Sequence, residues 1–292
     1  MTMPVAKVRP LATRKIGVMQ GRLLPKYLGR YQAHPVGYWA DEFKIAATLG
    51  VDCIEFILDF NDVEKNPLMS PSGCRQISNI SAQTGVEVKT ICADYFMEAP
   101  LHSSDNNIAK ASQDVLNQLI ENASQIGVTD IVIPLVDQSS LATQADQEKF
   151  VQQIQMFTSN AELGQINLCL ETDLRATEFK KLLEKINSDR VTVNYDIGNS
   201  AGLGFDPAEE FANYGDRITD LHIKDRSVGG SSVPLGEGDA NFLEVFSGVV
   251  RHGYDGPFIM QAFRDEEGVE IFKRQLAWFR STLESFDQKF DL

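Results

Sequence analysis

Short apolar runs alternate along this chain with longer stretches whose apolar residues recur at helical spacing. Eight runs are expected as β-strands: residues 16–21, 51–58, 86–93, 129–135, 166–171, 191–196, 218–224 and 256–261. Eight intervening segments are expected as helices: 38–50, 71–84, 105–126, 143–163, 176–187, a short one from Pro207, 240–252 and 266–286. Four of these helices end at a glycine directly before the next strand, a favourable helix terminus: Gly50, Gly85, Gly127 and Gly164.

Strict strand–helix alternation over this length predicts an α/β chain folded as one (β/α)8 TIM barrel domain. The barrel is expected over residues 15–292, after a flexible leader of residues 1–14. The alternative is an open doubly wound sheet, which usually carries a glycine-rich phosphate turn after its first strand. Residues 19–22 (MQGR) do not form such a turn.

Three consecutive strands each end in a side chain that can bind a metal ion. Glu171, Asp196 and His222 follow one another after 196 − 171 = 25 and 222 − 196 = 26 residues, one strand–helix–strand repeat each time. Period-two alternation places each on the polar face of its strand. Parallel strands joined by helices bring their carboxyl ends to one side of a sheet. The three side chains are therefore expected to converge on one divalent cation, hydrogen-bonded barrel residues being the alternative for any one of them.

The eighth strand contributes Gln261 to the same rim. It shares a face with Ile259 and Phe263 and offers a carbonyl oxygen without charge. With it, the expected metal ligands are four, and their charge is about −2 against a +2 ion.

Composition limits the kinds of partner. The net charge is 27 − 41 = −14, whereas nucleic-acid binding requires a basic surface, so no nucleic-acid partner is expected. No segment reaches the roughly 18 apolar residues of a membrane span, and no secretory signal is recognisable, so no membrane partner is expected. The four cysteines lack metal-type spacing and are expected to be buried free thiols in a cytoplasmic protein: Cys53, Cys74, Cys92 and Cys169.

From Lys15 onward the chain resembles the sugar isomerase/epimerase superfamily of xylose-isomerase-like barrels, which also includes endonuclease IV. The matching motifs are LCLET with Glu171, NYDIGN with Asp196, DLHIKDR with His222, LGEGDANF (235–242) and GVDCIEFILD (50–59). The resemblance implies a Mn²⁺-, Mg²⁺- or Zn²⁺-type ion chelated by a sugar or sugar phosphate. A carboxylate, for which Glu171 is the candidate, would move a proton on the carbon beside the carbonyl, while the ion stabilises the enediolate.

Two positions depart from the family pattern. Where epimerases of this group use a second glutamate, strand eight has Gln261, which cannot transfer protons as a carboxylate does. Asn199 replaces a histidine that often contacts substrate. The resemblance therefore favours aldose–ketose isomerisation, which needs one base, over two-base epimerisation. A carboxylate from residues 265–267 is a candidate replacement.

Further polar residues are candidates for substrate binding. Glu55 on strand two either faces the barrel mouth or makes a structural hydrogen bond. Lys224 either binds substrate or pairs with Asp196 or Asp225.

Arg22, Arg226 and Arg264 each follow a strand end and are candidates for a shared phosphate site, surface salt bridges being the alternative. The loop 226–238 is a candidate mobile cover or an ordinary surface loop.

Other functions are compatible with the same residues. A sugar-binding barrel without catalysis and a lyase or dehydratase are the alternatives to a sugar isomerase or epimerase. A nuclease resembling endonuclease IV is disfavoured, because the chain has only four histidines and an acidic charge. The resemblance also suggests a homodimer or homotetramer.

Overall fold

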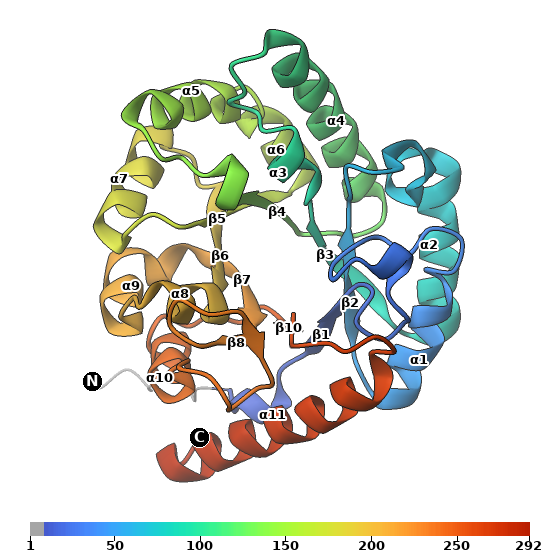
Figure 1. Cartoon of the computed structure of the whole chain (residues 1–292), viewed down its shortest axis with the longest axis vertical. Helices are drawn as coiled ribbons and strands as arrows, with labels where there is room; N and C mark the ends of the chain where they lie inside the picture. Colours follow the sequence, from blue (N-terminus) through green and yellow to red (C-terminus); the bar gives the residue numbers. More distant parts are fainter. Residues whose placement is uncertain (1–8) are drawn as a thin grey trace, which may run out of the picture.

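Eight parallel strands close into a barrel in a computed structural model that describes residues 9–292 (Figure 1). Their order around the barrel is β1-β10-β7-β6-β5-β4-β3-β2, so neighbours in sequence are neighbours in space. The barrel strands are β1 (Ile16–Met19), β2 (Cys53–Ile57), β3 (Glu87–Cys92), β4 (Asp130–Leu135), β5 (Asn167–Thr172), β6 (Val191–Asp196), β7 (Ile218–Ile223) and β10 (Phe258–Met260). The (β/α)8 barrel prediction is therefore confirmed.

Helices form an outer ring around the strands (Figure 1). They are α1 (Asp41–Leu49), α2 (Pro71–Thr84), α4 (Asn106–Gln125), α5 (Gln144–Gln155), α6 (Thr158–Gly164), α7 (Ala176–Ile186), α9 (Pro207–Tyr214), α10 (Phe242–Arg251) and α11 (Val269–Phe290). The segment predicted as one helix at 143–163 is two, α5 and α6. The predicted stop at Gly164 is wrong by one residue, because Gln165 adopts the left-handed conformation that ends α6 (φ 54°).

Two short helices and a hairpin were not predicted. Helix α3 (Tyr95–Glu98) is separated from β3 by Ala93 and Asp94, and α8 (Ile197–Leu203) follows β6 directly. An antiparallel pair, β8 (Asp225–Arg226) and β9 (Ser232–Val233), lies at the start of and within the loop 226–238. The Asp225 carboxylate accepts hydrogen bonds from the backbone N–H groups of Gly236, Gly238 and Ala240, so it fixes the far end of this loop.

The apolar core has two layers. The larger layer lies between the strands and the helices and contains Leu168, Leu170 and Leu221. The smaller fills the barrel interior with Met19, Cys53, Ile57, Cys92, Val132, Cys169 and Ile259. All four cysteines are buried and free, as predicted.

One side chain lies on the unexpected face of its strand. Alternation predicts Thr219 on the apolar outer face with Leu221, but its hydroxyl lies 2.7 Å from the Thr192 hydroxyl and 3.2 Å from the Cys169 sulfur, inside the barrel. The cause is a register shift between β6 and β7, where Val193 pairs with Ile218 and Asn194 pairs with Asp220. The bulge adds one residue and reverses the side chain that it carries.

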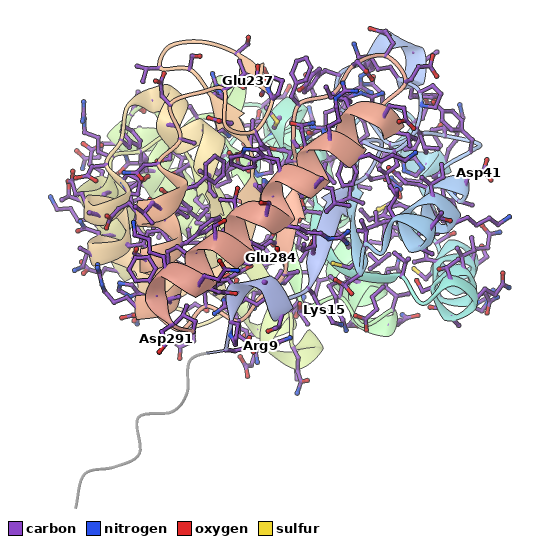
Figure 2. All side chains as sticks on the ribbon, turned by 90° about the horizontal axis from the view of Figure 1, so that it is seen from below. Arg9, Lys15, Asp41, Glu237, Glu284 and Asp291 are labelled. Atoms are coloured by element: carbon purple, nitrogen blue, oxygen red, sulfur yellow. The ribbon has the colours of Figure 1, made fainter. Side chains whose placement is uncertain are left out.

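Residues 11–13 pack against the last helix, α11, at the amino-terminal end of the barrel. Part of the expected leader, residues 1–8, lies outside the described residues. Within the same expected leader, Leu11 is fully buried in a short 3-10 helix (Leu11–Thr13). The Asp287 carboxylate on α11 accepts the N–H groups of Leu11 and Ala12 at 2.9 and 2.8 Å. Figure 2 shows Arg9 and Lys15 at this end and Glu237 at the opposite one. Within residues 9–292, no helix is long and apolar enough to cross a membrane.

Candidate active site

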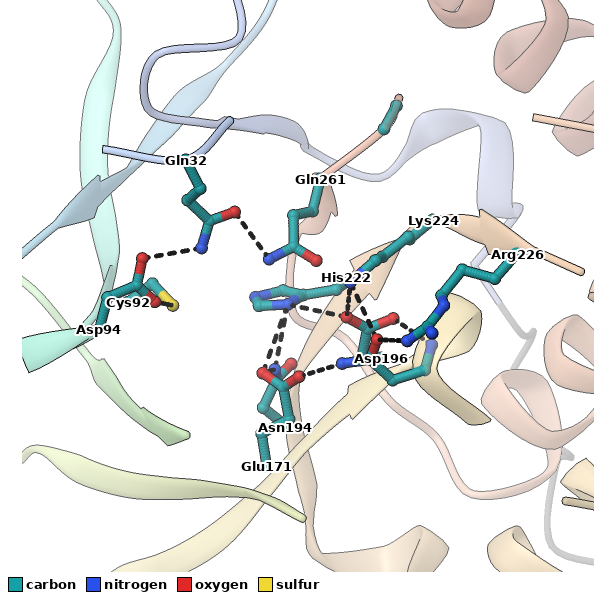
Figure 3. Close-up of polar contacts among 12 residues, drawn as sticks. Gln32, Cys92, Asp94, Glu171, Asn194, Asp196, His222, Lys224, Arg226 and Gln261 are labelled. Atoms are coloured by element: carbon teal, nitrogen blue, oxygen red, sulfur yellow. Dashed lines mark hydrogen bonds and ion pairs between the residues drawn. The ribbon is translucent and has the colours of Figure 1, made fainter. Parts of the chain in front are cut away.

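Three ligand-type side chains meet at the carboxyl ends of neighbouring strands. Glu171 lies near the end of β5, Asp196 ends β6 and His222 lies on β7. The His222 Nδ1 atom is 3.8 Å from Glu171 Oε2 and 3.8 Å from Asp196 Oδ2 (Figure 3). One possible ligand atom from each residue lies within 4.8 Å of the others. The structure therefore brings together the three residues that the strand spacing was expected to bring together.

The other ring nitrogen of His222 is hydrogen-bonded to a carboxylate in the barrel interior. Its Nε2 lies 2.8 Å from Glu55 Oε1, and both side chains are fully buried. A neutral imidazole with its proton on Nε2 donates to Glu55 and directs the Nδ1 lone pair towards Glu171 and Asp196. Burial lowers the pKa of His222, but Glu55, Asp196 and Glu171 together raise it well above its ordinary value. A cation bound here therefore competes with a proton.

The two carboxylates are held in different ways. Glu171 accepts amide hydrogen bonds from Asn194 at 3.0 Å and from Asn199 at 2.5 Å, while burial and the Asp196 charge raise its pKa to about 7. Burial also acts to raise the pKa of Asp196, but Lys224 and His222 hold it below its ordinary range. The environment thus separates a carboxyl that gains a proton near neutrality from one that stays ionised.

Local backbone structure explains why Asp196 and Lys224 meet. Asp196 Oδ1 caps α8 by accepting the Asn199 N–H at 2.8 Å, which leaves Oδ2 for the Lys224 ammonium group at 3.1 Å. The Lys224 side chain runs against Gly198, where a Cβ atom would lie 2.5 Å from Lys224 Cγ. A side chain at position 198 would displace the lysine.

The donor set suits a divalent cation. The Gln261 Nε2 group donates to Gln32 at 3.2 Å, whereas its Oε1 atom is buried without a hydrogen-bond partner. A carbonyl oxygen, an imidazole nitrogen and two carboxylates form a mixed set that Mg²⁺, Mn²⁺ and Zn²⁺ accept. A second cluster, Glu55, Asp220 and His222, is equally tight. Because Nε2 is already bonded to Glu55, we assign this second cluster to orienting His222.

The site opens into a cavity of about 210 Å³. Its walls come from the loop after β1 and the ends of β3, β4, β5, β7 and β10. They include Arg22, Gln32, Asp94, Asp137, Glu171, Asn199, Lys224, Arg226, Ser232 and Gln261. A larger groove of about 520 Å³, lined by Lys15, Asp52 and Glu87, lies at the opposite end of the strands, away from the convergent side chains.

Several residues predicted to bind substrate have other partners. Arg226 reaches the cavity wall, where its Nη1 donates to Asn199 Oδ1 at 3.0 Å and its Nη2 to the Gly230 carbonyl at 2.7 Å. Lys224 donates to the same Asn199 oxygen at 2.9 Å. Glu55 lies beneath His222 and does not reach the cavity.

The structure does not bring Arg264 to this cavity. Its guanidinium donates to the backbone carbonyls of Gly21 and Leu24 at 2.6 and 2.8 Å, so it ties the loop after β10 to the loop after β1. Arg22 does line the cavity but donates to the Ala262 carbonyl at 3.0 Å. The three arginines therefore do not form the shared anion site that their positions after strands suggested.

Three residues at the site received no role from the sequence. Asn194 was visible as the residue two before Asp196 on the same strand face. Asp94 was visible as the polar residue directly after the third predicted strand. Gln32 lies in the long loop after β1, which has no periodicity to reveal it.

Known proteins match this chain along most of its length. A family model described as xylose isomerase-like TIM barrel matches residues 43–282. L-ribulose-5-phosphate 3-epimerases of Salmonella paratyphi A and Escherichia coli are 27% and 26% identical over 250 residues, covering 82% of this chain and 87% of theirs. A solved L-ribulose 3-epimerase superposes with a TM-score of 0.75 at 17% identity, covering 95% of this chain and 97% of that one.

Proposed function

The chain belongs to the xylose isomerase-like TIM barrel family, and we propose that it is a divalent-cation-dependent isomerase or epimerase of a small sugar or sugar phosphate. The observation that carries the proposal is the convergence of Glu171, Asp196 and His222 beside a cavity that Glu171 and Gln261 line, where Gln261 Oε1 has no hydrogen-bond partner among residues 9–292. The names of the curated relatives, which are sugar-phosphate 3-epimerases, support the substrate class.

The proposed cation would be held by Glu171, Asp196 and His222, with Gln261 Oε1 as a fourth donor. When bound, a divalent cation supplies positive charge that acidifies the carbon beside a sugar carbonyl. Glu171 takes the proton from that carbon. The amides of Asn194 and Asn199 fix the orientation of this carboxylate.

A cationic wall faces this carboxylate. The Lys224 and Arg226 side chains both donate to Asn199 Oδ1 at the edge of the cavity. Together they suit a hydroxyl-rich or phosphorylated part of the substrate. We retain Asn199, Lys224 and Arg226 as proposed substrate-binding residues and leave Arg264 and Glu55 out of that group.

Deuterium incorporation tests the proposal. The protein, supplied with Mn²⁺ or Mg²⁺ in D₂O, is offered 2-ketopentoses, 2-ketohexoses and their terminal phosphates. Solvent deuterium should enter a carbon next to the carbonyl, with an aldose or an epimer as the product. A binding protein would give no incorporation, and a lyase or dehydratase would give a product of lower mass. Either result would overturn the proposal.

Assembly and location are parts of the same proposal. We expect a homodimer or homotetramer, measurable by light scattering, and a cytoplasmic location in which the four buried thiols stay reduced.

A further inference from the structure

An epimerase must remove a proton from one face of a carbon and return one to the other, and Gln261 cannot supply the second proton. Among the cavity-lining residues, Glu171, Asp94 and Asp137 carry carboxyl groups. Asp137 is solvent-exposed, whereas Asp94 is partly buried and lies two residues after the end of β3. Asp94 is therefore the carboxyl group that shares the enclosed part of the cavity with Glu171.

Asp94 and Gln261 are joined through one amide. Gln32 Nε2 donates to Asp94 Oδ2 at 2.8 Å, and Gln32 Oε1 accepts from Gln261 Nε2 at 3.2 Å (Figure 3). The same Gln32 oxygen also accepts from Arg22 Nη2 at 2.9 Å. Arginine has donors only, so it fixes the direction of both amides. The Gln32 oxygen must face Arg22, its NH₂ group must face Asp94, and the Gln261 oxygen must point away from Gln32.

This chain of hydrogen bonds presents Asp94 to the cavity in a defined orientation. Its Oδ1 atom accepts only the weak Cys92 thiol donor at 3.2 Å. In the barrel, β3 lies diametrically opposite β7, which carries His222, and β5 lies halfway between them. Asp94 and Glu171 therefore lie on different sides of the barrel mouth (Figure 3).

We propose that Asp94 is the second proton-transfer group of this site and that it makes epimerisation possible although strand eight carries glutamine. This inference rests on the proposed function. Glu171 removes the proton from one face, and the C–H electron pair forms the enediolate double bond. The carbon then takes a proton from the Asp94 carboxylic acid on the other face, leaving Asp94 ionised and Glu171 protonated. Exchange with water resets both groups, and the reverse reaction uses them in the opposite order.

The electrostatic environment supports both protonation states. Burial raises the pKa of Asp94, while its hydrogen bond from Gln32 acts in the other direction. A carboxyl whose pKa is raised holds a proton more readily near neutral pH and so serves better as an acid.

The test compares both epimers of a ketose or ketose phosphate on which the wild type incorporates deuterium. Asp94→Asn should lower epimer formation by at least about 100-fold, and it should still exchange the hydrogen of the one epimer whose C–H bond faces Glu171. Glu171→Gln, which also removes a charge from the proposed cation site, should show the mirror pattern and exchange only the other epimer when it is assayed at a Mn²⁺ concentration that saturates it. Glu98→Gln, which alters an exposed carboxylate on the neighbouring helix α3, is the matched control.

Calorimetric titration with Mn²⁺ keeps the test independent of turnover. Asp94→Asn should bind Mn²⁺ as the wild type does, and adding Gln261→Glu to it should restore epimer formation. The role of Asp94 would be overturned if Asp94→Asn lost exchange equally from both epimers or formed the epimer as the wild type does. It would also be overturned if the wild type exchanged hydrogen only through interconversion of ketose and aldose and formed no epimer. No wild-type exchange on any ketose would overturn the proposed function and this inference with it.

Discussion

His222 Nε2 and Glu55 Oε1 are 2.8 Å apart in the barrel interior, where neither side chain has any exposed surface. The pair joins β7 to β2 across the barrel and leaves Nδ1, which lies 3.2 Å from Asn194 Nδ2, as the ring nitrogen on the side of Glu171 and Asp196. Glu55 thus acts on the site through another residue.

Removing the charge of Glu55 should weaken cation binding. Glu55→Gln is expected to raise the dissociation constant for Mn²⁺ about 10- to 100-fold, because a ligating histidine depends on its carboxylate partner for basicity and orientation. Isothermal titration calorimetry measures this. Glu87→Gln, an exposed carboxylate at the opposite end of the barrel, is the control. An unchanged dissociation constant would show that Glu55 does not act on the ion.

The proposed ligands should determine metal content. Purified protein is expected to hold about one divalent ion per chain, and Asp196→Ala or His222→Ala should lose most of it. Elemental analysis after dialysis gives the answer. Asp216→Ala, which removes an exposed carboxylate beside His252, should keep the ion. Metal content that is equal in all these variants would disprove the ligand assignment.

A carboxylate at position 261 should strengthen cation binding. Gln261→Glu adds a negative charge to a ligand set of about −2, and we expect roughly tenfold tighter Mn²⁺ binding, since ligand charge is a main determinant of affinity in such sites. Gln261→Met, which removes the carbonyl oxygen at similar length, should bind more weakly. If neither variant changes the affinity, Gln261 is not a ligand.

His34 should make the free energy of unfolding depend on pH below neutrality. Burial lowers the pKa of His34 to about 4 from 6.5, so the unfolded chain binds the proton more readily. The contribution of neutral His34 to the free energy of unfolding is complete above pH 6.5. As the pH falls from 6.5 towards 4, the free energy of unfolding decreases by up to about 3 kcal/mol.

His34→Asn removes this titration and keeps a donor for Gln20 Oε1, which lies 3.0 Å from His34 Nδ1. Urea unfolding between pH 7 and 4 should show that the free energy of unfolding falls less with decreasing pH in the variant than in the wild type. NMR titration of the imidazole should give a pKa near 4. A His34 pKa near 6.5 would contradict the prediction that burial of this imidazole makes stability depend on pH.

The sequence predicted the barrel and the convergence of three side chains for one reason. Both depend on strand period and repeat length, which Glu171, Asp196 and His222 display directly. Thr219 was misplaced because a bulge changes the register without any local sequence signal. Arg264 and Glu55 were assigned to substrate because position after or within a strand does not reveal which partner a long side chain finds. Gln32 was invisible, since an irregular loop has no period.

The contact of Leu11 and Ala12 with Asp287 also bears on how the chain folds during synthesis. The partners are separated by 276 and 275 positions, and β1 pairs with β10 near the end of the chain as well. The base of the barrel therefore cannot close until β10 and Asp287 have left the ribosome. Until then β1 has only β2 as a barrel partner, and its other edge is an unpaired strand edge of the kind that pairs with foreign chains.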